Sequence, residues 1–195
     1  SYTADGTLRY ARSFGGEGRG VVVDDEGNAF VTGEVAGVAV DVDPGPDAVI
    51  LNPQEGRVFL VSYDPSGDLR FGFSVGGGRA SYLESGHGIA LDALGNVFLT
   101  GVINDEADFD PDEEGEEMVE VRGNTDAFLA SYSNDGIVRF AFALGGEKLC
   151  IRMLVIGMFI RIQHRLDVNS EWRNPLGMTS VEIKGELHKP FNLTF

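Results

Sequence analysis

Two acidic segments hold the residues best suited to bind a metal ion. Their six aspartates are Asp41, Asp43, Asp47, Asp108, Asp110 and Asp112. Carboxylates spaced two to four residues apart on a tight loop can converge on one hard cation, and Ca²⁺ accepts oxygen ligands in flexible geometry. Neither segment matches an EF-hand loop. We predict a candidate Ca²⁺ site here, and the alternative is a solvated Asp-x-Asp-Pro turn that ends a strand.

His87 is the residue that most resembles a general base. However, the equivalent position of a related segment is Arg19, and no nucleophile lies at motif spacing from His87. A histidine without such neighbours is more commonly an exposed loop residue. Asp24 and Asp25 are a carboxylate pair, but adjacent residues of a strand point to opposite faces, so we interpret them as turn formers. No catalytic residues are predicted.

Charge divides the chain into two parts. Residues 1–147 hold 27 acids and eight arginines, a net charge of −19, whereas residues 148–195 hold seven bases and four acids, a net charge of +3. So acidic a chain disfavours nucleic acid and anionic membranes as partners. The apolar run 149–162 is too short to span a bilayer. We expect residues 148–195 to be an unrelated C-terminal segment, artefactual or poorly ordered, with a sorting domain as the alternative.

Two sequence units repeat within the first 147 residues. Residues 18–33 read GRGVVVDDEGNAFVTG, and residues 86–101 read GHGIALDALGNVFLTG. The second unit begins at Ser1, Ser62 and Ser131, and its last copy reads SYSNDGIVRFAFALGG. Each unit holds two short apolar or aromatic runs around a turn rich in Asp, Asn and Gly, which is typical of a β-hairpin.

Two hairpins per repeat predict four antiparallel strands, the content of one propeller blade. We therefore predict an all-β fold, a partial β-propeller of about two and a half four-stranded blades with a non-repeat tail. Its predicted parts are residues 1–16 (the end of a blade), 17–77 and 78–147 (two blades) and the tail 148–195. A β-solenoid or a β-sandwich is the alternative. The phenylalanines that recur in both repeats are expected to fill the space between neighbouring blades.

These motifs resemble the bacterial SBBP repeat family of seven-bladed β-propellers. In the first copy the resemblance is carried by Asp24, Gly27, Asn28, Phe30, Thr32, Gly33, Asp41, Asp43, Pro44, Phe59, Tyr63 and Gly67. In the second copy it is carried by Asp92, Gly95, Asn96, Phe98, Thr100, Gly101, Asp108, Asp110, Pro111, Phe128, Tyr132 and Gly136. One departure is Arg57, which stands where the later repeat has Asp126. The resemblance implies a secreted or surface-attached bacterial protein and no common catalytic activity.

An arginine recurs in the second unit, at Arg9, Arg70 and Arg139. We expect these side chains on the solvent side of an outer strand, paired with nearby carboxylates, and a cationic ring for an anionic glycan is the alternative. The function predicted is a non-catalytic, extracellular scaffold whose loops bind protein or glycan, stabilised by Ca²⁺ if the acidic segments bind it. A ring would need further blades from outside this chain. The alternative is a fragment of a propeller enzyme, a polysaccharide lyase or hydrolase.

Overall fold

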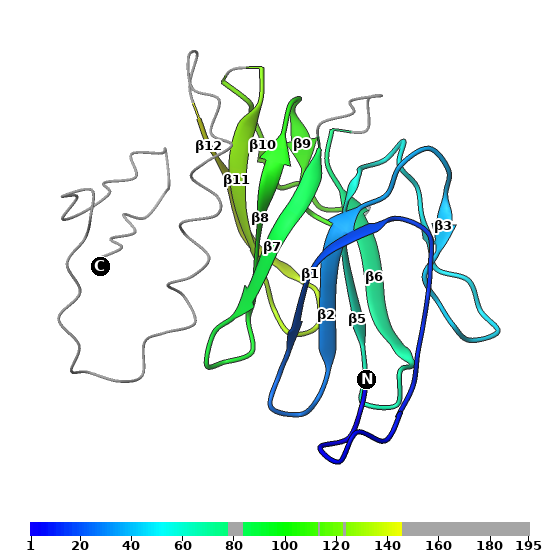
Figure 1. Ribbon diagram of the computed structural model, residues 1–195. Coiled ribbons are helices and arrows are strands. Elements are labelled where there is room, and N and C mark those ends of the chain that lie inside the picture. Colours follow the sequence, from blue (N-terminus) through cyan, green and yellow to red (C-terminus); the bar gives the residue numbers. More distant parts are fainter. Residues whose placement is uncertain (78–83, 113, 123, 146–195) are drawn as a thin grey trace, which may run out of the picture. The chain divides into compact units, whose positions relative to one another are not determined.

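The computed structural model describes four stretches of the chain, residues 1–77, 84–112, 114–122 and 124–145. They contain twelve β-strands and no helix (Figure 1). Every described residue belongs to the first of the two units into which the chain divides, Ser1–His164. The predicted tail 148–195 lies outside the described residues. In the described part no helix is long and apolar enough to cross a membrane.

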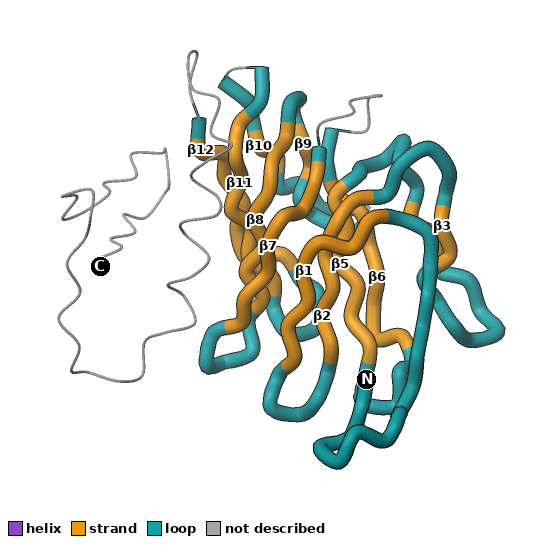
Figure 2. The backbone as a smooth tube through the Cα atoms, in the orientation of Figure 1, coloured by secondary structure: helices purple, strands orange, loops and turns teal. Residues whose placement is uncertain are grey.

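The first four-stranded sheet has the order β1-β2-β5-β6, and all of its neighbouring strands are antiparallel (Figure 2). Its strands are β1 (Glu17–Val23), β2 (Ala29–Glu34), β5 (Val58–Tyr63) and β6 (Leu69–Val75). Strand β5 reads VFLVSY and every residue of it is buried. An unbroken buried run of this kind is expected of a strand that is covered on both faces. The first sheet is therefore packed on both sides.

The second sheet repeats this arrangement with the order β12-β11-β8-β7. Its strands are β7 (Ser85–Leu91), β8 (Val97–Ile103), β11 (Asp126–Tyr132) and β12 (Val138–Leu144). The ladder of the first hairpin shifts register between Gly18 and Gly20, and the same shift occurs between Gly86 and Gly88. The predicted all-β fold with four antiparallel strands per repeat is confirmed at this level.

The turns between paired strands form as their residue types predict. Asp24 N–H donates to the carbonyl of Asn28 at 3.0 Å, and Asp92 donates to Asn96 at the same distance. Gly27 and Gly95 have φ values of +89° and +76°, a region that glycine enters without steric cost. Both turns thus have one geometry, set by the Asp-x-x-Gly-Asn pattern.

Each repeat also contains a short two-stranded ladder that the sequence analysis did not predict. The ladders pair β3 (Val40–Asp41) with β4 (Ile50–Leu51), and β9 (Ala107–Asp108) with β10 (Met118–Val119). They lie within the connections from β2 to β5 and from β8 to β11. A buried tyrosine fastens each ladder to its sheet. Tyr63 Oη donates to the Val42 carbonyl at 2.8 Å, and Tyr132 Oη donates to the Phe109 carbonyl at 3.0 Å.

The larger hydrophobic core lies between the two sheets. It contains Phe30 and Leu60 from the first sheet together with Ile89, Leu99 and Tyr132 from the second. Strand β7 contacts both β1 and β2. Neither sheet can bury these side chains alone, and fully burying one such side chain contributes roughly 1.5–3 kcal/mol. The two repeats therefore stabilise each other through this core.

A second core covers the opposite face of the first sheet. Val35, Val40, Leu51 and Phe59 are buried there, and the half-buried Phe14 packs against them. The rings of Phe14 and Phe59 meet edge to face, with centroids 5.6 Å apart. The N-terminal residues thus cover the side of the first sheet that is turned away from the second.

Residues 1–10 fold back on themselves without forming a regular strand. Ser1 N donates to the Tyr10 carbonyl and Arg9 N donates to the Ser1 carbonyl, both at 2.9 Å, and Tyr2 bridges to Leu8. The second unit in the first sheet has the same register, because Tyr63 pairs there with Leu69. Residues 1–16 thus keep the turn of a second unit.

Candidate functional site

In the first acidic segment the carboxylates bind backbone amides. Asp41 Oδ1 accepts hydrogen bonds from Asp43 N at 3.0 Å and Val49 N at 3.1 Å. Asp43 Oδ1 accepts one from Gly45 N at 2.7 Å, and Asp47 is exposed. Aspartates that accept the N–H two residues ahead form Asx turns. This segment is therefore shaped by its own carboxylates.

The second acidic segment extends the same pattern. Asp108 Oδ1 accepts from Asp110 N at 3.0 Å and Glu117 N at 2.9 Å, and Asp110 Oδ1 accepts from Asp112 N at 3.0 Å. Asp112 Oδ1 in turn accepts from Glu114 N at 3.1 Å. Each aspartate of this series therefore stabilises the turn that follows it in the loop.

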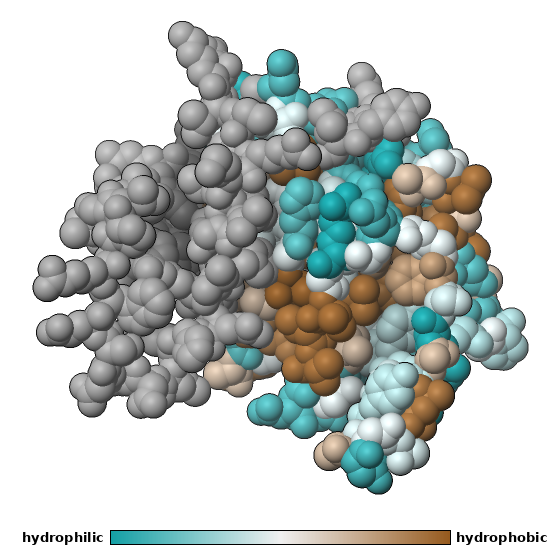
Figure 3. Space-filling model, in the orientation of Figure 1, coloured by the Kyte–Doolittle hydropathy of each residue, from teal (hydrophilic) through white to brown (hydrophobic). Residues whose placement is uncertain are grey.

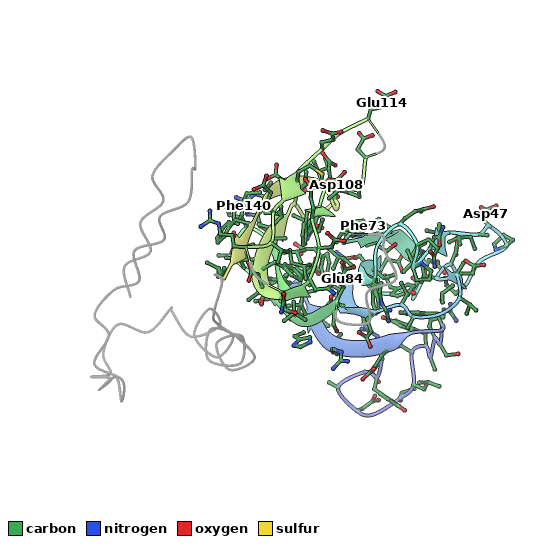
Figure 4. All side chains as sticks on the ribbon, turned by 90° about the horizontal axis from the view of Figure 1, so that it is seen from above. Asp47, Phe73, Glu84, Asp108, Glu114 and Phe140 are labelled. Carbon is green, nitrogen blue, oxygen red and sulfur yellow. The ribbon has the colours of Figure 1, made fainter. Side chains whose placement is uncertain are left out.

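The described residues include no group of three or more histidine, cysteine, aspartate or glutamate side chains arranged to hold a metal ion. The two acidic segments also lie apart, as the positions of Asp47 and Asp108 in Figure 4 show. Each segment would have to bind Ca²⁺ by itself, with carboxylate oxygens that already accept backbone hydrogen bonds. The six-aspartate Ca²⁺ site remains a prediction.

Acidic residues also line a shallow depression beside the second segment. Its lining residues are Asn104, Asp105, Glu106, Glu120 and Val121. They come from the β8–β9 and β10–β11 connections, on either side of the short ladder that leads into the second acidic segment. A concentration of one charge sign attracts oppositely charged ligands and raises their rate of association. This depression therefore favours cationic partners over anionic ones.

Glu84 lies where the first repeat meets the second (Figure 4). It is fully buried, and its Oε1 accepts a hydrogen bond from Gly77 N at 3.0 Å. Burial raises the pKa of the Glu84 carboxyl above its ordinary value, although the Gly77 N–H and the Arg57 guanidinium act in the opposite direction. A Cβ built on Gly76 would lie 2.6 Å from Glu84 Oε2, so glycine is needed there. We call Arg57, Gly76, Gly77 and Glu84 the first joint.

At the opposite end, Arg70 joins the two repeats. Its Nη2 donates to Asn134 Oδ1 at 2.5 Å, and Asn134 Nδ2 donates to Asp24 Oδ2 at 3.1 Å. The guanidinium lies 5.5 Å from the centroid of Phe30, within the range of a cation–π contact. The expected pairing exists, since Arg70 lies 3.6 Å from Asp135. The expected solvent position is wrong for Arg70, because the second repeat covers its side chain to 20% exposure.

The expectation of an exposed loop position is wrong for His87, which lies half-buried on strand β7. The equivalent Arg19 on β1 forms ion pairs with Glu17 at 3.3 Å and Glu34 at 3.4 Å. The two residues share one position in the repeat but differ in chemistry and in surroundings.

Sequence reasoning missed the residues that hold the repeats together. Glu84 falls just after the stretch 78–83, where the second repeat has extra residues relative to the first. Its position after Gly76-Gly77 was therefore not visible from the repeat alignment. Tyr63 and Tyr132 were recognised as repeated residues, and their recurrence was a usable signal for a hydrogen bond made in both copies.

Comparisons with family models, with curated proteins and with solved structures return no match. The likeness to SBBP repeats therefore rests on the motif residues quoted above, and the functional argument on the geometry of the two repeats.

Proposed function

We propose that this chain is a segment of a β-propeller of the SBBP type, a non-catalytic scaffold of a secreted or cell-surface bacterial protein. Its loops serve as a binding surface for protein or glycan. Further blades from outside this sequence complete the ring. One observation carries the proposal. The contact that joins the two sheets is repeated between the N-terminal residues and the first sheet.

That recurring contact is an aromatic ring seated on a glycine of the next repeat. A Cβ built on Gly136 would lie 3.0 Å from the Phe71 ring, and one built on Gly67 would lie 2.7 Å from the Tyr10 ring. Tyr10 and Phe71 occupy the same place in the second unit, and so do Gly67 and Gly136. A two-sheet sandwich has a single interface of this kind. A repeated interface supports a stack that grows by the same step.

The exposed faces also support a longer stack. Val21 on β1 is 64% exposed, whereas its equivalent Ile89 on β7 is only 6% exposed because the first sheet covers it. Val23 is 60% exposed as well, and Figure 3 shows an apolar patch in this part of the surface. Apolar residues at positions that a neighbouring repeat buries favour another repeat on that side.

The structural roles of the polar residues favour a scaffold over an enzyme. Asp24 and Asp92 hold turns, Glu84 lies in the first joint, and Arg70 links the repeats. The acidic connections project away from the sheets in two different directions, and Glu114 and Asp47 mark their tips in Figure 4. Loops carried by a rigid scaffold are the usual place for recognition. Their charge favours cationic protein surfaces or glycan hydroxyls.

The test that separates a ring from an open solenoid is a series of lengthened chains. Further copies of residues 77–145 are inserted after Gly145 of the full chain, one copy at a time, and unfolding by urea is followed. In an open solenoid the gain in stability continues with each copy. In a propeller the stability rises with each copy only until the ring closes, at one fixed copy number. Electron micrographs of that chain then show discs.

A matched series carries Gly136→Val in every copy, which places a side chain against the aromatic ring at each interface. This series is expected to gain nothing per copy. Steady gains without closure would overturn the propeller, and equal gains in both series would overturn the interface on which it rests.

The Ca²⁺ part of the proposal has its own test. The melting temperature of the full chain is measured with 5–10 mM CaCl₂, a range set by the roughly 10⁻⁴–10⁻³ M dissociation constants of extracellular modules. Binding to the folded state alone raises the melting temperature, and Asp108→Asn with Asp110→Asn removes the rise. An unchanged melting temperature would eliminate Ca²⁺ as a stabiliser.

A further inference from the structure

The second repeat has a buried carboxylate where the first repeat has an arginine. Asp126 occupies the position of Arg57, at the strand that leads into the second hairpin of its repeat. It is fully buried, and its Oδ2 accepts a hydrogen bond from Arg122 N at 2.8 Å. Its Oδ1 is buried and has no hydrogen-bond partner. Glu84 Oε2 in the first joint is likewise buried without a hydrogen-bond partner. A buried carboxylate oxygen of this kind is costly to keep, so a cationic donor placed beside Asp126 would stabilise the fold.

The first joint shows which parts of the chain meet at this position. There Arg57 belongs to the first repeat, and Glu84 enters from the segment that begins the second repeat. The Glu84 carboxylate lies over Gly76, and the Asp126 carboxylate lies over Gly145, the equivalent glycine. At the first joint the carboxylate therefore comes from the following repeat, through Glu84. At the second joint it comes from the repeat itself, through Asp126. A further anion at that place would meet Asp126 with like charge.

We infer that the outward side of the second sheet binds a following repeat of the same kind, whose residue at the position of Glu84 is cationic and pairs with Asp126. The inference rests on the proposed function, because it takes the stack to continue. It adds the chemistry of the partner, a repeat with lysine or arginine at its joint. Opposite pairings at successive joints would fix the order of repeats, since mismatched charges disfavour wrong neighbours.

Other features of the same face agree with this partner. Arg139 is exposed, whereas its equivalent Arg70 is covered by the next repeat and bonded to Asn134. Phe98 is half-buried, whereas its equivalent Phe30 is fully buried in the core between the sheets. Figure 4 shows Phe140 on the side of the second sheet away from Phe73. The face therefore presents the same groups that the first repeat uses to bind the second.

The experiment is a charge-exchange cycle on the full chain with one extra copy of residues 77–145 inserted after Gly145. Position 126 ahead of the insertion either keeps Asp126 or carries Asp126→Arg. The inserted copy either keeps Glu84 or carries Glu84→Arg. The two matched combinations are Asp with Arg and Arg with Glu. We expect chains with a matched combination to have equilibrium constants for unfolding about tenfold or more smaller than chains with a mismatched one, which is the usual size of coupling between contacting residues. A control cycle pairs the exposed Asp135→Arg with the same Glu84→Arg and is expected to show no coupling.

The outcomes separate the two proposals. If no corner of the cycle is more stable than the parent chain, the inserted repeat does not stack and the proposed function fails. If every corner gains stability equally, the repeat stacks and the cationic joint alone is overturned. In the parent chain, Lys148→Gln and Asp126→Asn are compared singly and together. Coupling between them would identify the partner of Asp126 as the chain's own C-terminal segment and would also overturn the inference.

Discussion

The first and second repeats have the same aromatic side chains in the same internal arrangement, but they bury them differently. The rings of Phe30 and Phe71 are 6.3 Å apart, and those of Phe98 and Phe140 are also 6.3 Å apart. Yet Phe30 is fully buried and Phe98 is half-buried. The difference arises from what lies next to each sheet, because the second repeat covers Phe30. Burial here is a property of position in the stack.

The reverse difference occurs on the other faces of the two sheets. Ile89 is buried by the first repeat, whereas Val21 remains exposed although it occupies the same position. Residues 9–16 cover only part of that face, through Phe14 and Tyr10. One repeat thus exposes the face that the other buries. Such a pair behaves as two units whose stability comes largely from their shared interface.

The strongest test of this comparison removes one equivalent ring from each repeat. Phe30→Ala is expected to lower the free energy of unfolding by about 3–5 kcal/mol, because it opens a cavity between the sheets. Phe98→Ala is expected to cost about 1 kcal/mol, since its ring is already half in water. Urea unfolding of the full chain measures both. Equal losses would show that the burial difference between the repeats has no energetic meaning.

A smaller effect is expected at the contact of Arg70 with the second repeat. Asn134→Ala removes an acceptor from the Arg70 guanidinium and a donor from Asp24, which should cost about 1–3 kcal/mol. Asp135→Ala is the matched control and should cost less than about 0.5 kcal/mol, because Asp135 is 82% exposed.

The contact also couples two distant residues. A double-mutant cycle of Asn134→Ala with Arg70→Lys should show non-additivity, because lysine cannot reproduce the guanidinium geometry. Additive losses would mean that the two side chains act independently, and that the comparison between Arg70 and the exposed Arg139 needs another explanation.

The sequence predicted the parts of the fold that depend on local pattern. Alternating aromatic and small residues between Asp-x-x-Gly-Asn turns are enough to place the hairpins, and duplication indicates that they recur. The short ladders were missed because β3 and β4 have only two residues each and lie within acidic segments read as turns. The hydrogen bond from Tyr63 to the Val42 carbonyl joins the first ladder to its sheet, and no local pattern relates these two residues.

The candidate site was less accessible from sequence for a physical reason. A carboxylate such as Asp41 can ligate a cation or accept backbone N–H bonds, and only geometry separates these uses. Likewise Arg70 reads as a surface residue until the second repeat covers it. The contacts of Glu84 with Gly77 and Arg57 join parts of the chain that no local pattern relates.

The smallest effect expected concerns pH, and it contrasts the turn acids with the joint acid. Partial burial raises the pKa of Asp24 and of Asp92, but hydrogen bonds from Asn28 and Asn96 outweigh it and leave both values below the ordinary one. Their contribution to stability is present above the unfolded pKa, about 3.9, and is lost as the pH falls through the folded value. Both repeats share this behaviour.

The pKa of Glu84 is shifted in the opposite direction to those of Asp24 and Asp92. Its pKa is raised by burial, so the folded chain holds this proton more tightly than the unfolded chain does. Stability from this group is therefore greatest below the unfolded pKa, about 4.3, and declines as the pH rises through the folded value. Glu84→Gln keeps an acceptor for Gly77 N and removes the charge. We expect this variant to be more stable at pH 7, by up to about 1 kcal/mol, and to lose that advantage near pH 4.

Midpoints of urea unfolding measured every half pH unit from 3.5 to 7 test this sign. Asp24→Asn serves as the control, because it should lose its difference from the parent at the acid end and should be less stable at neutral pH. A Glu84→Gln chain that is less stable than the parent at pH 7 would mean that ionised Glu84 gains more from Arg57 than burial takes away. In that case charge pairing, more than the apolar core, would hold the two repeats in register.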